Sequence, residues 1–164
     1  MFKCTHLLFI AALGLLSQPL LAQPQVDLVV VKKSLSQLRL MSNGKILHKY
    51  HVAMGDMPRG HKLKEGDQRT PEGRYILDYK KPNSTYYRAI HISYPNDEDM
   101  FRARALGLNP GGQIMIHGQN PHTDLSPEEA QQYNWTNGCI AVTNKEMDEI
   151  WKLVEPGTPI EIWP

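Results

Sequence analysis

Two β-prone runs flank a turn in the segment Ser36-Gln37-Leu38-Arg39-Leu40-Met41-Ser42-Asn43-Gly44-Lys45-Ile46-Leu47-His48-Lys49-Tyr50-His51-Val52-Ala53-Met54. Asn43-Gly44 is the kind of pair that best tolerates the positive φ angles of a two-residue hairpin turn. Leu38 and Leu40 alternate with polar residues before the turn, and Ile46, Tyr50 and Val52 share one alternating set of positions after it. This alternation predicts a β-hairpin with one buried face.

Further strands are expected on both sides of this hairpin. The β-branched run Val26–Lys32 precedes it, and later strands are expected over residues 75–80, 88–94, 113–116 and 158–162. A helix is expected over residues 97–106, with the acidic run Asp97-Glu98-Asp99 as its solvated start and Gly107 after its end. We therefore predict one mainly β domain with a few helices, folded as a mixed β-sandwich or as a curled sheet.

Two more helices carry start signals of the capping-box type. Ser126-Pro127-Glu128-Glu129 offers a cap residue, a proline at the first helical position and a glutamate at the third. Thr143-Asn144-Lys145-Glu146 opens a second such segment, which Pro156-Gly157 ends. Within it, four large residues recur at helical spacing, Met147, Ile150, Trp151 and Val154. Met147 and Trp151 are therefore expected in the core.

The N-terminus predicts export. Lys3 precedes the apolar run Leu7–Leu16, which is too short to span a bilayer, and the small residue Ala22 precedes Gln23. We interpret residues 1–22 as a signal peptide and residues 23–164 as a single domain; an uncleaved anchor is the alternative. The expected location is the periplasm or cell envelope, with no stable membrane insertion after cleavage.

Composition excludes several classes of function. The 164 residues carry 18 Lys and Arg against 17 Asp and Glu, and no block of like charge stands out. Neither a nucleic-acid partner nor a polybasic membrane surface is therefore expected. Cleavage after Ala22 removes Lys3 and Cys4, which leaves Cys139 as the only cysteine. A single thiol cannot crosslink its own domain, so Cys139 is either buried and inert, paired with another chain, or a reactive nucleophile.

Two segments carry the residues for such chemistry. Gln113-Ile114-Met115-Ile116-His117-Gly118 ends an apolar strand on a histidine, and Trp135-Thr136-Asn137-Gly138-Cys139-Ile140-Ala141-Val142-Thr143 places a glycine before the thiol. An imidazole beside a thiol can take its proton, and the imidazolium then holds the thiolate. Gly138 would let a substrate carbonyl approach the backbone, and the amides of Gly138 and Cys139 are candidate donors to an oxyanion.

A zinc site is a second interpretation of these residues. Zinc bound by His117, His122 and Cys139 is the weaker alternative, because close ligand pairs at established zinc spacings are absent from the sequence. The remaining histidines of the domain are interpreted as ordinary strand or loop residues: His48, His51, His61 and His91.

Four segments, in this order along the chain, resemble the L,D-transpeptidase catalytic domain family, the YkuD domain, and in particular its YafK-like branch. They are Lys64-Glu65-Gly66-Asp67-Gln68-Arg69-Thr70-Pro71-Glu72-Gly73-Arg74-Tyr75, His91-Ile92-Ser93-Tyr94-Pro95-Asn96, Gly111-Gly112-Gln113-Ile114-Met115-Ile116-His117-Gly118 and Trp135-Thr136-Asn137-Gly138-Cys139-Ile140-Ala141-Val142-Thr143. The resemblance implies the fold of that domain and an enzyme that acts on peptidoglycan stem peptides, without a metal or other cofactor.

The resemblance also implies roles for individual residues. It makes Cys139 the nucleophile and His117 the base, with the carbonyl of Gly118 orienting the imidazole. Gly138, Asn137 and Gly118 would supply the backbone of the oxyanion site. The candidate substrate contacts are Thr136, Tyr94, Arg104, Arg69 and Trp135, of which Thr136 is also expected to brace the cysteine loop. The segment from Gln119 to Trp135 is a candidate lid over the cleft.

The chain departs from the commoner family pattern at two positions. Asn137 replaces a second histidine before the Gly-Cys pair, and Ala141 stands where many members have an arginine. If that arginine meets a substrate carboxylate, one of Arg69, Arg102 and Arg104 would have to replace it.

Three functions stay open at this point. The first is an L,D-transpeptidase in which Cys139 attacks the carbonyl on the L-centre of diaminopimelate in a tetrapeptide stem, releases D-alanine and passes the acyl group to an amine. The second is a hydrolase on the same thioester path, an amidase, endopeptidase or L,D-carboxypeptidase, including one that releases a wall-attached lipoprotein. The third is a non-catalytic peptidoglycan-binding domain; the presence of both His117 and Cys139 argues against it.

Overall fold

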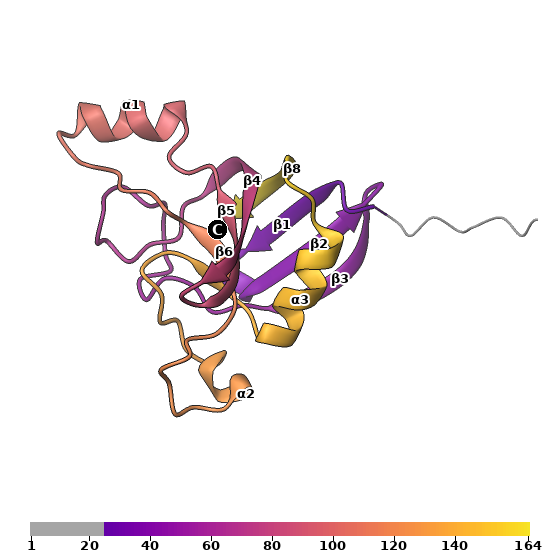
Figure 1. Cartoon of the computed structure of the whole chain (residues 1–164). Coiled ribbons are helices and arrows are strands. Elements are labelled where there is room, and N and C mark those ends of the chain that lie inside the picture. Colours follow the sequence, from indigo (N-terminus) through magenta and orange to yellow (C-terminus); the bar gives the residue numbers. More distant parts are fainter. Residues whose placement is uncertain (1–24) are drawn as a thin grey trace, which may run out of the picture.

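A mixed sheet of eight strands makes up most of the described structure (Figure 1). The computed structural model describes residues 25–164, so the predicted signal peptide lies outside the described residues. The strands are β1 (Leu28–Lys32), β2 (Gln37–Ser42), β3 (Lys45–His51), β4 (Gly73–Ser84), β5 (Tyr87–Ile92), β6 (Met115–His117), β7 (Ile140–Ala141) and β8 (Thr158–Trp163). Their spatial order is β3-β2-β1-β8-β4-β5-β6-β7, with β1–β8 and β6–β7 paired parallel. The predicted fold class, mainly β with a few helices, is confirmed.

The sheet curls until its two edge strands meet. β3 and β7 stand at opposite ends of the strand order, yet Ala53, just past β3, exchanges backbone hydrogen bonds with Ala141 of β7. The Ala53 amide donates to the Ala141 carbonyl at 3.0 Å, and the Ala141 amide donates back at 2.8 Å. Of the two predicted architectures the structure is therefore the curled mixed sheet, with its edges partly closed by this bridge.

The predicted hairpin is formed by β2 and β3. Asn43 and Gly44 take positive φ angles of 50° and 74° at the turn. The inward positions Leu38, Leu40, Tyr50 and Val52 are buried as predicted.

The prediction for Ile46, on the same hairpin, is wrong, because this side chain is 40% exposed. The pairing shifts from Leu40–His48 to Met41–Ile46, so Leu47 is an extra residue that reverses the alternation. A β-bulge of this kind leaves no signal in a simple alternating pattern.

Three α-helices and a short 3₁₀ helix complete the fold. They are η1 (Lys33–Leu35), α1 (Asp97–Ala105), α2 (Pro127–Ala130) and α3 (Asn144–Leu153). Reciprocal capping boxes begin all three α-helices, and those at Ser126 and Thr143 confirm the sequence signals. Within residues 25–164 no helix has the length and apolar character needed to cross a membrane.

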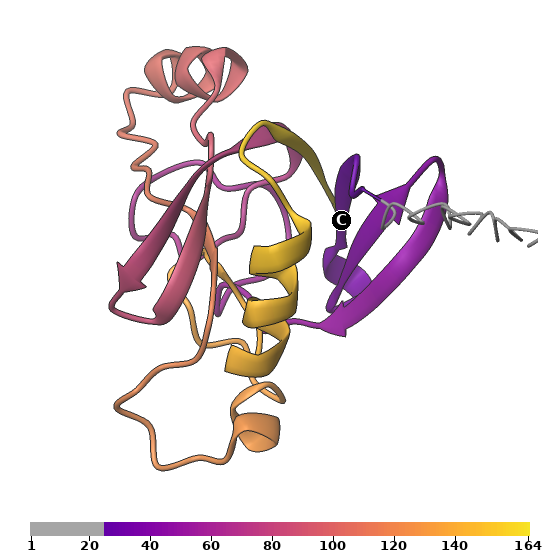
Figure 2. The ribbon, with the colours of Figure 1, turned by 45° about the vertical axis from the view of Figure 1, so that its right-hand side comes forward.

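Helix α3 packs between two parts of the curled sheet. Figure 2 shows it between the β1–β3 end and the β4–β5 hairpin. Met147 and Ile150 are fully buried on its inner face, whereas Trp151, expected in the core, is half-buried and lies under the Lys80 ammonium. The Tyr50 hydroxyl, from β3, donates to Glu149 at 3.3 Å. Lys80, from β4, donates to the Trp151 carbonyl at 2.8 Å, so α3 ties the two parts together.

A buried polar cluster fastens α1 to the sheet. The sequence predicts a solvated helix start here, but Asp99 is 5% exposed and accepts hydrogen bonds from His61 Nε2 at 3.0 Å and from the Tyr75 hydroxyl at 2.9 Å. Burial alone would raise the pKa of Asp99, but the hydrogen bonds from His61, the Asn96 amide and Tyr75 hold it below its usual value. His61 is accordingly a cluster residue rather than an ordinary loop residue.

Replacing Tyr75 by Phe should lower the free energy of unfolding by about 2 kcal/mol, because the buried Asp99 carboxylate would lose the hydrogen bond that the Tyr75 hydroxyl donates. Thermal denaturation measures this loss. The matched control is Tyr79→Phe on the same strand, because Tyr79 is 41% exposed. Equal stability of the two variants would contradict the assignment.

Candidate active site

Parallel pairing of β6 with β7 brings His117 and Cys139 to one face of the sheet. Ile116 pairs with Ile140, and His117 pairs with Ala141. Paired residues on adjacent strands point to the same face, as do residues two apart on one strand. Cys139 directly precedes β7 and is two residues before Ala141, so it projects from the face of His117.

Two aromatic rings enclose His117, the last residue of β6. The imidazole is 2% exposed. The Tyr86 ring stacks on it with centroids 4.7 Å apart, and the Trp135 ring meets it edge-on at 5.7 Å. Tyr86 and Trp135 also contact each other edge-on. These contacts fix the plane of the imidazole before any ligand binds.

The hydrogen bond of His117 to Gly118 determines its tautomer. Nδ1 lies 2.6 Å from the Gly118 carbonyl oxygen, and because a carbonyl can only accept, Nδ1 carries the hydrogen. Nε2 then keeps a free lone pair. Burial lowers the pKa of His117 to about 4, although the bond to Gly118 raises it in part. At neutral pH the ring is therefore a neutral base.

Cys139 is partly buried and uncharged in its resting form. Its thiol donates to the Gln113 carbonyl at 3.6 Å. Burial raises the pKa of the Cys139 thiol, while a backbone hydrogen bond from Met115 and the positive charge of Lys62 lower it in part. Thiol and imidazole are therefore both neutral at rest, so the proton has to move as the sulfur attacks.

Thr136 holds the cysteine loop in shape. Its hydroxyl donates to the Cys139 carbonyl at 2.7 Å and accepts from the Gly138 amide at 3.1 Å. Gly138 has a φ of +120°, and a Cβ there would lie 2.5 Å from the Arg69 carbonyl oxygen. Only glycine fits this turn, because both the backbone angle and the close approach exclude a side chain.

Some of the amides predicted to donate to an oxyanion already donate hydrogen bonds within the protein. The Gly138 amide donates to Thr136, and the Gly118 amide donates to the Tyr86 carbonyl at 3.0 Å. Gly118 therefore serves through its carbonyl, which orients His117. Within residues 25–164 the amides of Asn137 and Cys139 have no hydrogen-bond acceptor in the protein. These two are the amides still able to meet a developing negative charge.

The five predicted substrate contacts lie in different surroundings. Tyr94 is 2% exposed and donates to the Pro110 carbonyl at 3.1 Å, and the Thr136 hydroxyl is engaged in the loop, so neither side chain is open to a ligand in this structure. Arg104 lies exposed on α1, which projects from the sheet in Figures 1 and 2. The Arg69 guanidinium reaches the His61 carbonyl at 3.5 Å. The Trp135 ring meets the His117 imidazole edge-on, with centroids 5.7 Å apart.

The predicted lid segment forms a small cavity next to that tryptophan. Its volume is about 210 Å³, and it is lined by Asn120, Thr123, Leu125, Ala130, Tyr133 and Trp135. All six of these residues belong to the segment, and one of them, Trp135, also contacts His117. His122 does not join His117 and Cys139 in a ligand set: in the described part of the chain no three His, Cys, Asp or Glu side chains gather as a metal site.

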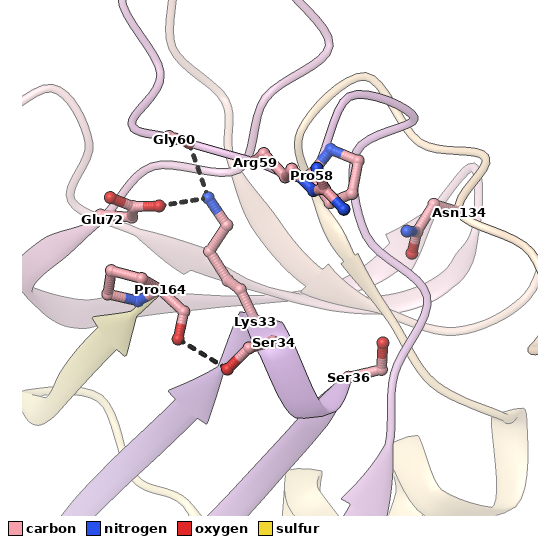
Figure 3. Close-up of a pocket in the computed structure, with 9 residues that line it drawn as sticks. All are labelled: Lys33, Ser34, Ser36, Pro58, Arg59, Gly60, Glu72, Asn134 and Pro164. Atoms are coloured by element: carbon pink, nitrogen blue, oxygen red, sulfur yellow. Dashed lines mark hydrogen bonds and ion pairs between the residues drawn. The ribbon is translucent and has the colours of Figure 1, made fainter.

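A second cavity, of about 470 Å³, borders the loop of residues 60–72 at Gly60 and Glu72 (Figure 3). Lys33 enters it and donates to the Gly60 carbonyl at 2.7 Å, the Thr70 carbonyl at 2.9 Å and the Glu72 carboxylate at 2.8 Å. Burial lowers the pKa of Lys33, while the Glu72 carboxylate raises it in part. All three N–H groups of this ammonium are used within the protein, so Lys33 anchors the loop.

Sequence reasoning missed three residues near the site. Tyr86 stacks on His117, and Lys62 and Asp67 form a buried ion pair 2.8 Å long in the loop that packs on Gly138. Asp67 lies in a segment that carried the family resemblance, but its partner Lys62 lies two residues outside it. A stacking partner from a distant hairpin leaves no local signal.

Comparison with solved structures identifies the class of fold. The L,D-transpeptidase from Mycobacterium smegmatis aligns with a TM-score of 0.57 over 85% of this chain and 59% of that chain, at 16% identity, a likeness in fold alone. Pgp2, the helical cell shape determining protein of Campylobacter jejuni, aligns with a TM-score of 0.61 over 85% of this chain and 48% of that chain, at 26% identity. The fold is that of an L,D-transpeptidase catalytic domain.

Sequence comparison gives the family. Residues 26–162 match the L,D-transpeptidase catalytic domain, YkuD, and the chain belongs to this family. It is 32% identical over 128 residues to YafK of Escherichia coli strain K12, whose name makes it a candidate L,D-transpeptidase. The match covers 73% of this chain and 44% of YafK, so the chain spans less than half the length of that relative.

Replacing Gly138 by Ala should cost about 3 kcal/mol or more of unfolding free energy, because the new Cβ meets the Arg69 carbonyl and the φ is unfavourable. Gly157→Ala is the matched control: its φ is +94°, but a Cβ there has open space, so about 1 kcal/mol is expected. Chemical denaturation measures both. Similar losses of unfolding free energy in the two variants would mean that the contact with the Arg69 carbonyl adds nothing to the cost.

Proposed function

We propose that this chain is a peptidoglycan L,D-transpeptidase in which Cys139 is the nucleophile and His117 the general base. One observation carries the proposal. The Nδ1–H of His117 is bound to the Gly118 carbonyl, which leaves the basic Nε2 free, and the register of β6 with β7 brings the segment that carries Cys139 alongside His117. This pairing of nucleophile, base and orienting group is the arrangement that cysteine acyl transfer requires.

Acylation begins with proton transfer from the Cys139 thiol to Nε2 of His117. The sulfur attacks the carbonyl carbon on the L-centre of diaminopimelate in a stem tetrapeptide, and the carbonyl electrons move to oxygen. The amides of Asn137 and Cys139 are the donors available to that oxyanion. As the intermediate collapses, the C–N bond to D-alanine breaks and His117 returns its proton to the leaving amine. A thioester on Cys139 and free D-alanine result.

Transfer to an acceptor completes the cycle. The amine of a second stem, or of another acceptor such as a protein lysine, attacks the thioester carbon and loses a proton to His117. The sulfur leaves and takes that proton back, so the new amide bond forms and the thiol is restored.

Hydrolysis is the second candidate, and the exposed Asn137 favours it. This polar side chain stands two residues before the thiol, where it leaves that flank of the site accessible to water. Water in place of the amine would yield a carboxylate, as in an amidase, endopeptidase or L,D-carboxypeptidase, and release of a wall-attached lipoprotein would follow the same path. In both cases the protein would act in the cell envelope, after export directed by residues 1–22 and removal of that signal peptide.

Incubation with purified muropeptides followed by mass spectrometry tests these functions. We expect loss of product with Cys139→Ala and a fall of about 10³-fold in rate with His117→Ala, because a positioned general base contributes that much. A crosslinked dimer supports transfer, and a shortened monomer supports hydrolysis. Wild-type turnover by the Cys139→Ala variant would refute both. His91→Ala, a histidine paired with Asp78 on the sheet, serves as the control.

The pH dependence of kcat/KM should show an acid limb near pH 4 rather than near 6.5. A buried imidazole with its pKa lowered to about 4 stays neutral, and able to accept a proton, down to that pH. Stability sets a separate limit, because the unfolded chain takes up this proton at a higher pH. The unfolding free energy should therefore fall as pH decreases from about 6.5 to 4. Circular dichroism at each pH separates the two effects, and an acid limb between pH 6 and 7 on a folded protein would contradict the assignment.

A further inference from the structure

The peptide group that joins Gly118 to Gln119 is hydrogen-bonded at both of its polar atoms. Its carbonyl oxygen lies 2.6 Å from Nδ1 of His117, and its N–H donates to the side-chain oxygen of Asn144 at 2.9 Å. An amide N–H can only donate, so the atom that Asn144 turns toward it is Oδ1 rather than Nδ2. In a planar trans peptide the C=O and the N–H point in opposite directions. Asn144 therefore fixes the direction of the carbonyl that holds His117.

Residue 118 has to be glycine for Asn144 to come this close. A Cβ on Gly118 would overlap Asn144 Oδ1 and would lie 2.8 Å from the Cβ of Tyr87. Glycine constrains its own backbone angles weakly, so the orientation of the peptide that follows it depends on outside contacts. The Tyr86 carbonyl holds the Gly118 amide at 3.0 Å on one side, and Asn144 holds the Gln119 amide on the other.

The pairing that positions the cysteine loop also brings Asn144 to this peptide. Val142, directly after β7, donates its amide to the His117 carbonyl at 3.0 Å. Asn144 follows two residues later, as the first residue of α3. Its backbone N–H donates to Gln119 Oε1 at 3.4 Å, so Gln119 and Asn144 are joined in both directions. These bonds hold the residue that follows Gly118 against the start of α3.

The start of α3 does not account for the Asn144 side chain. The helix is capped by Thr143, whose hydroxyl accepts from the Glu146 amide at 3.2 Å, while the Glu146 carboxylate accepts from the Thr143 amide at 2.9 Å. Asn144 takes no part in this capping box. Its side-chain oxygen is therefore used for the peptide beside His117 and not for the helix.

We propose that Asn144 is a positioning residue that acts on His117 through the Gly118–Gln119 peptide. This inference rests on the proposed role of His117 as the general base. The Gly118 carbonyl keeps the hydrogen on Nδ1, and in that tautomer Nε2 is the basic nitrogen. Linked hydrogen bonds polarise one another, so the bond to Asn144 also strengthens the carbonyl as an acceptor. Asn144 thus does through one peptide what an orienting side chain does by direct contact with a catalytic imidazole.

NMR of the free, ¹⁵N-labelled protein at pH 7 tests the proposal at the imidazole itself. The His117 ring should show the Nδ1–H tautomer with a slowly exchanging Nδ1 proton, and His117→Ala identifies its signals. Asn144→Ala should speed the exchange of that proton about tenfold, the equivalent of one lost hydrogen bond. Asn144→Asp keeps an acceptor oxygen and should restore the wild-type signal. Asn144 is exposed, so neither variant leaves a void in the core.

Turnover of muropeptides gives a second readout. Asn144→Ala should lower kcat about tenfold and leave KM unchanged, because the base is misoriented while the contacts to substrate stay. Asn144→Asp should keep the wild-type kcat. The matched control is Asn96→Ala at the start of α1, which removes the same kind of bond, from the Asp99 amide to an asparagine oxygen at 3.0 Å. This control should lower Tm and leave kcat unchanged.

Three outcomes would overturn the proposal. The first is wild-type proton exchange at His117 in folded Asn144→Ala. The second is a raised KM with an unchanged kcat, which would make Asn144 a substrate contact. The third is an equal loss of kcat in Asn96→Ala, which would trace the effect to stability. The NMR readout needs no substrate: turnover by Cys139→Ala would refute the proposed function, and unchanged exchange in folded Asn144→Ala would refute the role of Asn144 alone.

Discussion

The two-sided pairing of Ala141 is the constraint on which the site depends. This residue pairs with His117 of β6 on one side and with Ala53, beyond β3, on the other. The short strand β7 is therefore held where the two edges of the curled sheet come together. Because Ala141 is fully buried there, the loop that ends in Cys139 enters the seam in one register, and a shift by one residue would turn the thiol away from His117.

Buried ammonium groups fix the loop that faces this seam. Lys33 holds its ends near Gly60 and Glu72, and the Lys62–Asp67 pair holds its middle. Glycine lets the loop approach the cysteine: at Gly138 the Arg69 carbonyl takes the space of a side chain. Polar groups in a small β domain usually cost stability when buried. Here they hold the loop whose Arg69 carbonyl packs against Gly138, the neighbour of Cys139.

Local sequence patterns predict the secondary-structure elements better than they predict the long-range contacts of individual side chains. The Asn43-Gly44 turn and the capping boxes at Ser126 and Thr143 depend on neighbouring residues, so the sequence was enough to find them. The predictions for Ile46 and Asp99 are wrong: a β-bulge exposes Ile46, and a hydrogen bond from the distant His61 accompanies the burial of Asp99. The same distinction holds at the site. His117 and Cys139 were singled out by residue type and order, whereas the Thr136 bond that engages the Gly138 amide and the stacking of Tyr86 depend on loop geometry and long-range contacts.

Burial acts in two opposite ways on the proposed chemistry. It raises the proton affinity of the Cys139 thiol and lowers that of the His117 imidazole, so the ion pair formed during attack is costly. The same low dielectric strengthens every fixed charge and dipole that faces the reacting atoms. Catalysis at such a site therefore depends on groups placed before the substrate arrives, such as the Gly118 carbonyl beside the imidazole and the backbone amides of the cysteine loop. A water-filled site with the same two catalytic residues would form the ion pair more easily but would stabilise the oxyanion less.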